Sequence, residues 1–290
     1  MGPRSEDSGP LSSGAAMVRS PAVAGQFYPA NPDHLRQEVR ELLVPAPHPI
    51  AALGCVVPHA GYMYSGGVAG AVYGALHLPS LFLILCPNHT GQGEPMAIMS
   101  AGEWRTPLGA ARIDSELAGH LLRACPMLRE DAGAHADEHS LEVQLPFLQY
   151  RVPHMRFVPI AIGRGDFAAL EQFGQALGQA LVGWREPLLI VASSDMNHYE
   201  RDELTRVKDG RAIEAILALD PGRLCRVLHE DHNTMCGYGP VIAMLDAARR
   251  LGADAATLIR YATSADAGGR RSAVVGYAGI AVHKTVTSDK

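Results

Sequence analysis

Residues 81–89 read LFLILCPNH, a continuous apolar run that ends just before His89. An apolar run without polar alternation is typical of a strand that is covered on both faces of a sheet. The runs LGCVV at 53–57 and LLIVA at 188–192 have the same character, and each also leads directly into polar residues. These three stretches predict the centre of a mostly parallel sheet.

Short apolar runs and segments with helical periodicity alternate along the chain, a pattern typical of βαβ units. Further strands are predicted over 157–162, 257–261 and 273–282. Helices are predicted over 68–76, 115–124, 167–182, 208–218, 222–230 and 240–251. Segment 93–109 contains Gly and Pro and favours an excursion or hairpin outside the central sheet. We predict a single α/β domain over 18–290, with a mostly parallel central sheet flanked by helices, after a Gly-, Ser- and Pro-rich disordered extension over 1–17.

The composition excludes several protein classes. The chain has 290 residues, 47% of them hydrophobic and 19% charged, with a formal net charge of −5. This balance is that of a globular protein, and no apolar run reaches the roughly 18 residues that a membrane span requires. No Lys/Arg cluster indicates a nucleic-acid surface. The 5 cysteines are scattered without a C-x-x-C pair, and no signal peptide is visible, so we expect a reducing cytoplasm.

Polar side chains follow three of the predicted strands. Strand 53–57 leads to His59, strand 81–86 leads to His89, and strand 188–192 leads to Asp195 and His198. Ligands of open α/β sheets bind beyond the carboxyl ends of the strands, so we expect these side chains to converge. Two imidazoles and one anionic ligand form a facial triad for Fe(II) or a site for catalytic zinc. The alternative for each histidine is a bond to a nearby carbonyl.

The third ligand of such a site has three candidates. Asp195 supplies a carboxylate, and His198 would share its face if the chain turned helically there. Cys236 lies in the loop NTMCGYGP at 233–240, which leads into a predicted helix. A cysteine near a helix N-terminus has a lowered pKa, and its thiolate binds metal. The alternative for Cys236 is a small buried hydrophobic residue.

His139 precedes Leu141, Leu145 and Leu148, which have helical spacing. We interpret it as a residue that contacts a metal ligand and orients it, or that closes the pocket wall. The alternative is a solvated first helical turn, where acidic neighbours are favoured by the helix dipole.

The sequence resembles the Memo family, called protein B of the AmmeMemoRadiSam system in prokaryotes, from Val18 to Val282. The resemblance rests on RSPAVAGQFYP at 19–29, VPHAGYMYSG at 57–66, CPNHTG at 86–91, EWRTPLG at 103–109, DEHSLEVQLPF at 137–147, SSDMNHY at 193–199, HNTMCGYGP at 232–240 and SAVVGYAGIAVH at 272–283. Each motif alone is weak evidence, whereas all of them in this order are specific. A match that starts at Val18 also favours Met17 as the natural start.

The resemblance implies a fold like that of the class III extradiol (LigB-type) dioxygenases, non-haem iron enzymes that open catechol rings. It matches His59 and His89 to the two metal-binding histidines, and Cys236 to the cysteine that Memo relatives place third. His198 matches the acid/base histidine of the dioxygenases, with Asp195 beside it. The dioxygenases have a carboxylate where this chain has Cys236, and a thiolate shifts metal preference towards softer ions.

We therefore expect a metal-binding protein, first of all a non-haem iron-dependent oxidoreductase that acts on a small aromatic or phenolic substrate. The expected cofactor is Fe(II), with Zn(II) or Cu as alternatives. A non-catalytic metal- or peptide-binding regulatory module and a zinc-dependent hydrolase are the other two readings. The family name implies a functional link to a radical-SAM enzyme and an AMMECR-type protein.

Overall fold

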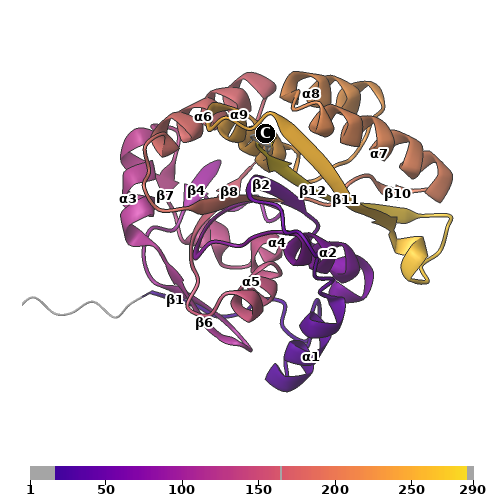
Figure 1. Ribbon diagram of the computed structural model, residues 1–290, viewed down its shortest axis with the longest axis horizontal. Helices are drawn as coiled ribbons and strands as arrows, with labels where there is room; N and C mark the ends of the chain where they lie inside the picture. The colour runs from indigo at the N-terminus through magenta and orange to yellow at the C-terminus, as the bar shows by residue number, and fades with distance from the viewer. Residues whose placement is uncertain (1–16, 164, 286–290) are drawn as a thin grey trace, which may run out of the picture.

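A mixed β-sheet runs through the middle of the molecule, with helices on both faces (Figure 1). The computed structural model describes residues 17–163 and 165–285. Its strands are β1 (Val18–Arg19), β2 (Ala52–Val57), β3 (Leu81–Pro87), β4 (Met96–Ile98), β5 (Glu103–Thr106), β6 (Gly109–Ile113), β7 (Arg129–Glu130), β8 (Arg156–Ile162), β9 (Leu188–Ser193), β10 (His198–Glu200), β11 (Ala255–Thr263) and β12 (Val274–His283). The predicted extension over 1–17 lies, except for Met17, outside the described residues.

The strand order is β1-β5-β6-β8-β3-β9-β2-β12-β10, with β11 paired to β12 and β4 to β8. Strands β8, β3, β9 and β2 are parallel, which confirms the predicted centre of the sheet. Their register pairs Leu85 with Ala192 and Val57 with Ser193. The carboxyl ends of β3, β9 and β2 therefore lie side by side.

The helices form two layers, one on each face of this sheet (Figure 1). They are α1 (Pro32–Leu42), α2 (Gly67–Ala75), α3 (Ser115–Ala124), α4 (His139–Glu142), α5 (Leu145–Arg151), α6 (Phe167–Leu181), α7 (Asp202–Leu217), α8 (Pro221–Glu230) and α9 (Tyr238–Arg250). Along β3, Leu83 and Leu85 pack in the core with α6 and α9, whereas Phe82 and Ile84 pack in the core with α2 and α5. This alternation explains why the strand is apolar throughout.

Several elements differ from the prediction, as the following examples show. A hairpin forms from β5 and β6, but β6 also pairs with β8, so the hairpin extends the edge of the sheet. Helix α7 begins at Asp202, whereas the prediction began at residue 208. The first turns were missed because their buried side chains include Asp202 and Asp209, so the sequence shows no apolar stripe there. Helix α1 was not predicted, although Asn31 caps it and proline occupies its first position.

None of the helices within the described ranges is both long enough and apolar enough to cross a membrane.

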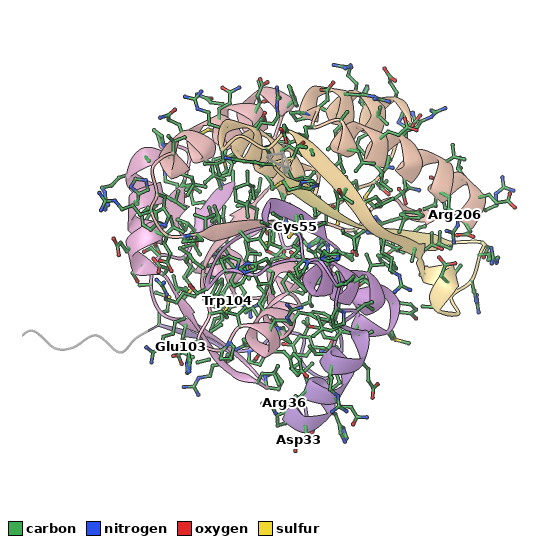
Figure 2. The ribbon with its side chains drawn as sticks, viewed as in Figure 1. Asp33, Arg36, Cys55, Glu103, Trp104 and Arg206 are labelled. Atoms are coloured by element: carbon green, nitrogen blue, oxygen red, sulfur yellow. The ribbon has the colours of Figure 1, made fainter. Side chains whose placement is uncertain are left out.

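The N-terminal segment is fixed to α4 through the buried carboxylate of Glu142. This carboxylate accepts hydrogen bonds from Arg19 Nη1 (2.6 Å), the backbone N–H groups of Ala22 and Val23 (2.8 and 3.1 Å) and Tyr28 Oη (2.5 Å). The Arg19 guanidinium lies 4.0 Å above the ring centroid of Trp104. Trp104, labelled in Figure 2, is fully buried. Both carboxylate oxygens of Glu142 accept hydrogen bonds. These bonds offset the free-energy cost of burying the charge.

We expect Glu142→Gln to lower the free energy of unfolding by about 3–5 kcal/mol, because it leaves the Arg19 charge buried without a counterion. Urea denaturation measures the change. The control is Glu214→Gln, which removes the exposed ion pair between Glu214 and Arg223 and should cost less than about 1 kcal/mol. Equal losses in the two variants would contradict a structural role for the buried pair.

Candidate metal centre

A cavity of about 890 Å³ opens at the carboxyl ends of β2, β3 and β9. All six side chains singled out in the sequence lie on its wall, namely His59, His89, His139, Asp195, His198 and Cys236. They come from segments far apart in the chain and meet because the parallel strands end at one edge of the sheet.

His59 is buried, and its hydrogen bonds define its tautomer. Its Nδ1 lies 2.9 Å from Ser193 Oγ. That hydroxyl donates its only hydrogen to the Ser140 carbonyl (2.6 Å) and also accepts from Gln144 Nε2 (2.9 Å). Since Ser193 has no second hydrogen to give, Nδ1 of His59 must be the donor. Burial lowers the pKa of His59, so the ring is neutral and its lone pair is on Nε2, the atom that faces Cys236 Sγ.

His89 has the same arrangement with a carboxylate as its partner. Its Nδ1 lies 3.0 Å from Glu138 Oε1, and its backbone N–H donates to Glu138 Oε2 (2.6 Å). Burial opposes ionisation of Glu138, but hydrogen bonds from His89 and Ser140 lower the pKa of its carboxyl to about 2. An ionised Glu138 accepts the Nδ1 hydrogen of His89 and leaves Nε2 as the free donor atom. Glu138 was not recognised from the sequence as a partner of His89.

Cys236 lies beside His59, immediately before the residue that caps α9. Its Sγ is 3.2 Å from His59 Nε2 and 3.7 Å from the carbonyl oxygen of Asp195. Burial, together with the Asp195 carboxylate, raises the pKa of the Cys236 thiol. The lowered pKa expected from the helix N-terminus is therefore wrong, because desolvation outweighs the backbone hydrogen bonds that lower the pKa, including that of Gly237.

Asp195 is also buried and close to His59. Its Oδ1 accepts from the backbone N–H of His59 (2.7 Å), and its Oδ2 lies 4.0 Å from His59 Nε2. Burial raises the pKa of Asp195 to about 7, and the backbone N–H groups of His59 and Ala60 partly oppose this shift.

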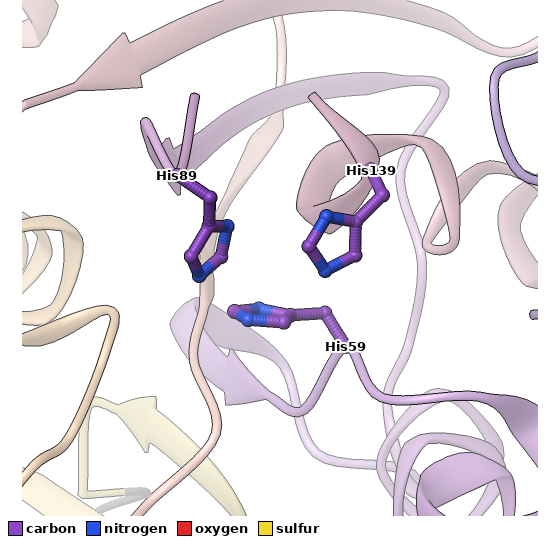
Figure 3. Close-up of side chains that lie close together, drawn as sticks. All are labelled: His59, His89 and His139. Atoms are coloured by element: carbon purple, nitrogen blue, oxygen red, sulfur yellow. The ribbon is translucent and has the colours of Figure 1, made fainter. Parts of the chain in front are cut away.

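His139 lies closer to the other imidazoles than expected for a residue that only orients a ligand. The ligand nitrogens of His59, His89 and His139 all lie within 4.8 Å of one another, a grouping that can hold a metal ion. Figure 3 shows the three rings facing a common space. His139 stacks on His89 with ring centroids 4.8 Å apart. Two ligand sets therefore share His59 and His89, with either Cys236 or His139 as the third member.

His198 reaches the cavity from β10. Residues 195–197 form no helix or turn, so the helical turn considered from the sequence is absent between Asp195 and His198. Its Nδ1 is buried and has no hydrogen-bond partner among the described residues. Burial lowers the pKa of His198, although backbone contacts oppose this effect. The His198 residue itself lies on the cavity wall, although Nδ1 is closed off from solvent.

Asn197, which the sequence analysis did not single out, connects the His198 strand to the Cys236 loop. Its side-chain oxygen accepts from the backbone N–H and Oγ1 of Thr234 (3.1 and 3.2 Å). Thr234 Oγ1 in turn accepts from the backbone N–H of His198 (2.8 Å). Asn197 is fully buried, and its only signal in the sequence is its place within SSDMNHY.

The donor set fits a transition-metal ion. The two imidazoles of His59 and His89 present Nε2 towards the cavity while Nδ1 is held by other groups, the usual arrangement of metal-binding histidines. A thiol next to imidazoles suits Fe(II), Zn(II) or copper, whereas Mg²⁺ and Ca²⁺ prefer oxygen ligands.

Comparisons with known proteins agree with this architecture. The family model described as Memo-like protein matches residues 19–281. A MEMO1 family protein of Methanopyrus kandleri is 43% identical over 278 residues, which cover 91% of this chain and 98% of the relative. A MEMO1 family protein of Methanothermobacter thermautotrophicus is 41% identical over a match that covers 90% of this chain and 99% of the relative. The crystal structure of an uncharacterized Escherichia coli K12 protein has the same fold, with a TM-score of 0.54, 14% identity and coverage of 79% of this chain and 98% of that one. The chain therefore belongs to the Memo-like protein family.

Proposed function

We propose that this protein binds Fe(II) through His59, His89 and Cys236 and acts as a non-haem iron-dependent oxidoreductase on a small aromatic or phenolic substrate. The observation that carries the proposal is the fixed tautomer of both histidines. Their Nδ1 atoms are bonded to Ser193 and Glu138, which leaves both Nε2 lone pairs for a metal ion. Cys236 Sγ lies 3.2 Å from one of these nitrogens.

Bound Fe(II) would supply one-electron redox chemistry and a Lewis acid. The protein's own residues would bind the substrate and move its protons. His198 lies on the cavity wall, so it is placed to take a proton from a phenol and return it later. Asp195 holds the backbone of His59 and thereby keeps that ring in position. His139, stacked on His89, would stiffen the second ligand.

A zinc-based function is the second candidate, and the thiol favours it. Catalytic zinc sites have three protein ligands drawn from histidine, cysteine and carboxylates, and two histidines and a cysteine are such a combination. In that case the same cavity would serve a zinc-dependent hydrolase. A non-catalytic metal- or peptide-binding regulatory module is a separate alternative that does not depend on zinc. Activity that survives replacement of Fe(II) by Zn(II) without oxygen would favour hydrolysis. Tight metal binding without oxygen uptake on any phenol would favour the binding module.

We expect His59→Ala and His89→Ala to lose most of their iron after anaerobic reconstitution, because each removes one Nε2 donor. We expect His198→Ala to keep its iron and to lose oxygen uptake with a panel of phenols. Elemental analysis and an oxygen electrode measure the two effects, with His77→Ala, an exposed residue, as the control. Wild-type iron content in both ligand variants would contradict the assignment.

The third ligand is tested by pairing Cys236→Ser with His139→Ala in protein loaded with Co(II). We expect wild type and His139→Ala to show a thiolate-to-cobalt charge-transfer band, and Cys236→Ser to lack it. If His139→Ala loses the metal while Cys236→Ser keeps wild-type affinity, the three-histidine group is the ligand set instead.

Glu138→Gln should weaken metal binding by about 10- to 100-fold, because it removes the carboxylate that orients His89. Competition with a chelator measures the dissociation constant. Glu130→Gln, at an exposed position on β7, serves as the control and should bind metal as wild type does. An unchanged dissociation constant for Glu138→Gln would show that His89 needs no such partner.

A further inference from the structure

The loop that borders the cavity after β11 carries two adjacent arginines with different partners. Arg271 donates to Asp202 Oδ2 (2.8 Å), and its carbonyl accepts from the backbone N–H of Asp202 (2.9 Å). Arg270 is exposed and lies on the cavity wall. Its side chain has no hydrogen bond or ion pair with any residue that the structure describes. One arginine therefore anchors the loop, and the other is left with a free guanidinium at the cavity.

The backbone on both sides of Arg270 is firmly held. The turn η3 (Ser264–Ala267) is fixed by a capping box between Thr263 and Asp266. Arg206, labelled in Figure 2, belongs to α7. It reaches the same turn and pairs with Asp266 at 2.8 Å. Gly269 packs so closely that a Cβ atom there would lie 2.6 Å from the Ser264 carbonyl oxygen. Since this loop is already ordered, a ligand that binds Arg270 would not have to immobilise its backbone.

The rest of the cavity wall offers no anion to compensate Arg270. Its one carboxylate among the described residues is Asp195, which is 4% exposed and already accepts from the backbone of His59. Aromatic rings of Phe27, Tyr64, Tyr199 and Tyr277 line the same cavity. The wall thus combines one uncompensated guanidinium with aromatic surface.

We propose that the cavity takes a ligand in which an aromatic ring carries a carboxylate or a similar planar anion, and that Arg270 binds this anion. The guanidinium fork matches a carboxylate through two parallel hydrogen bonds, which a neutral substituent cannot accept as well. The proposal rests on the proposed function in that it assigns the substrate class of the same cavity. It does not require that the cavity hold iron.

The test compares two probes that differ in charge, 4-hydroxybenzoate and 4-hydroxybenzyl alcohol. Isothermal titration calorimetry with the full chain, whose metal content is measured beforehand, gives both dissociation constants. We expect wild type to bind the carboxylate about tenfold more tightly, since a charge-assisted hydrogen bond at a partly exposed site has roughly that effect. Arg270→Gln should bind both probes with similar affinity, whereas Arg270→Lys should keep part of the preference.

The control is Arg249→Gln, which removes an exposed arginine near the far end of α9 and should keep the wild-type preference. Equal affinity for the two probes, no measurable binding of either, or a preference that survives in Arg270→Gln would overturn the proposal. A carboxylate preference in protein that fails to bind metal would leave this inference standing and refute the metal centre. Metal binding without a preference for the carboxylate probe would leave the metal centre standing and overturn the role of Arg270.

Discussion

The candidate metal centre depends on the two hydrogen bonds that hold the Nδ1 atoms of His59 and His89. A neutral imidazole carries one hydrogen, and its position decides which nitrogen can bind a metal. Ser193 gives its hydrogen to a carbonyl, and Glu138 is ionised, so both partners can only accept from Nδ1. Both free lone pairs are thereby placed on Nε2. Protein groups thus fix the donor atoms before any ion binds.

The short helix α4 connects these hydrogen bonds to the rest of the fold. Glu138, directly before it, holds His89, and the Ser140 carbonyl holds Ser193, which in turn holds His59. Glu142, at its end, binds the N-terminal segment through Arg19 and Tyr28. The parallel strands deliver the histidines to one edge of the sheet, and α4 sets their orientation. Buried carboxylates are tolerated there because hydrogen bonds satisfy them.

Features that depend on local sequence could be predicted, whereas those that depend on distant partners could not. The strands before His59 and His89 are continuous apolar runs, so their carboxyl ends were predicted to within one residue. Glu138 was missed because His89 lies 49 residues away in the sequence. The start of α7 was missed because Asp209 occupies its buried face. The direction of the Cys236 pKa shift was wrong because burial is a property of the folded chain.

The most direct test of the metal centre is an anomalous-diffraction map of crystals of this protein grown with Fe(II) under anaerobic conditions. We expect one iron peak within about 2.0–2.4 Å of His59 Nε2, His89 Nε2 and Cys236 Sγ, with the Nδ1 atoms still bonded to Ser193 and Glu138. Iron bound through Nδ1 of either histidine, or a cavity without an iron peak, would contradict the account.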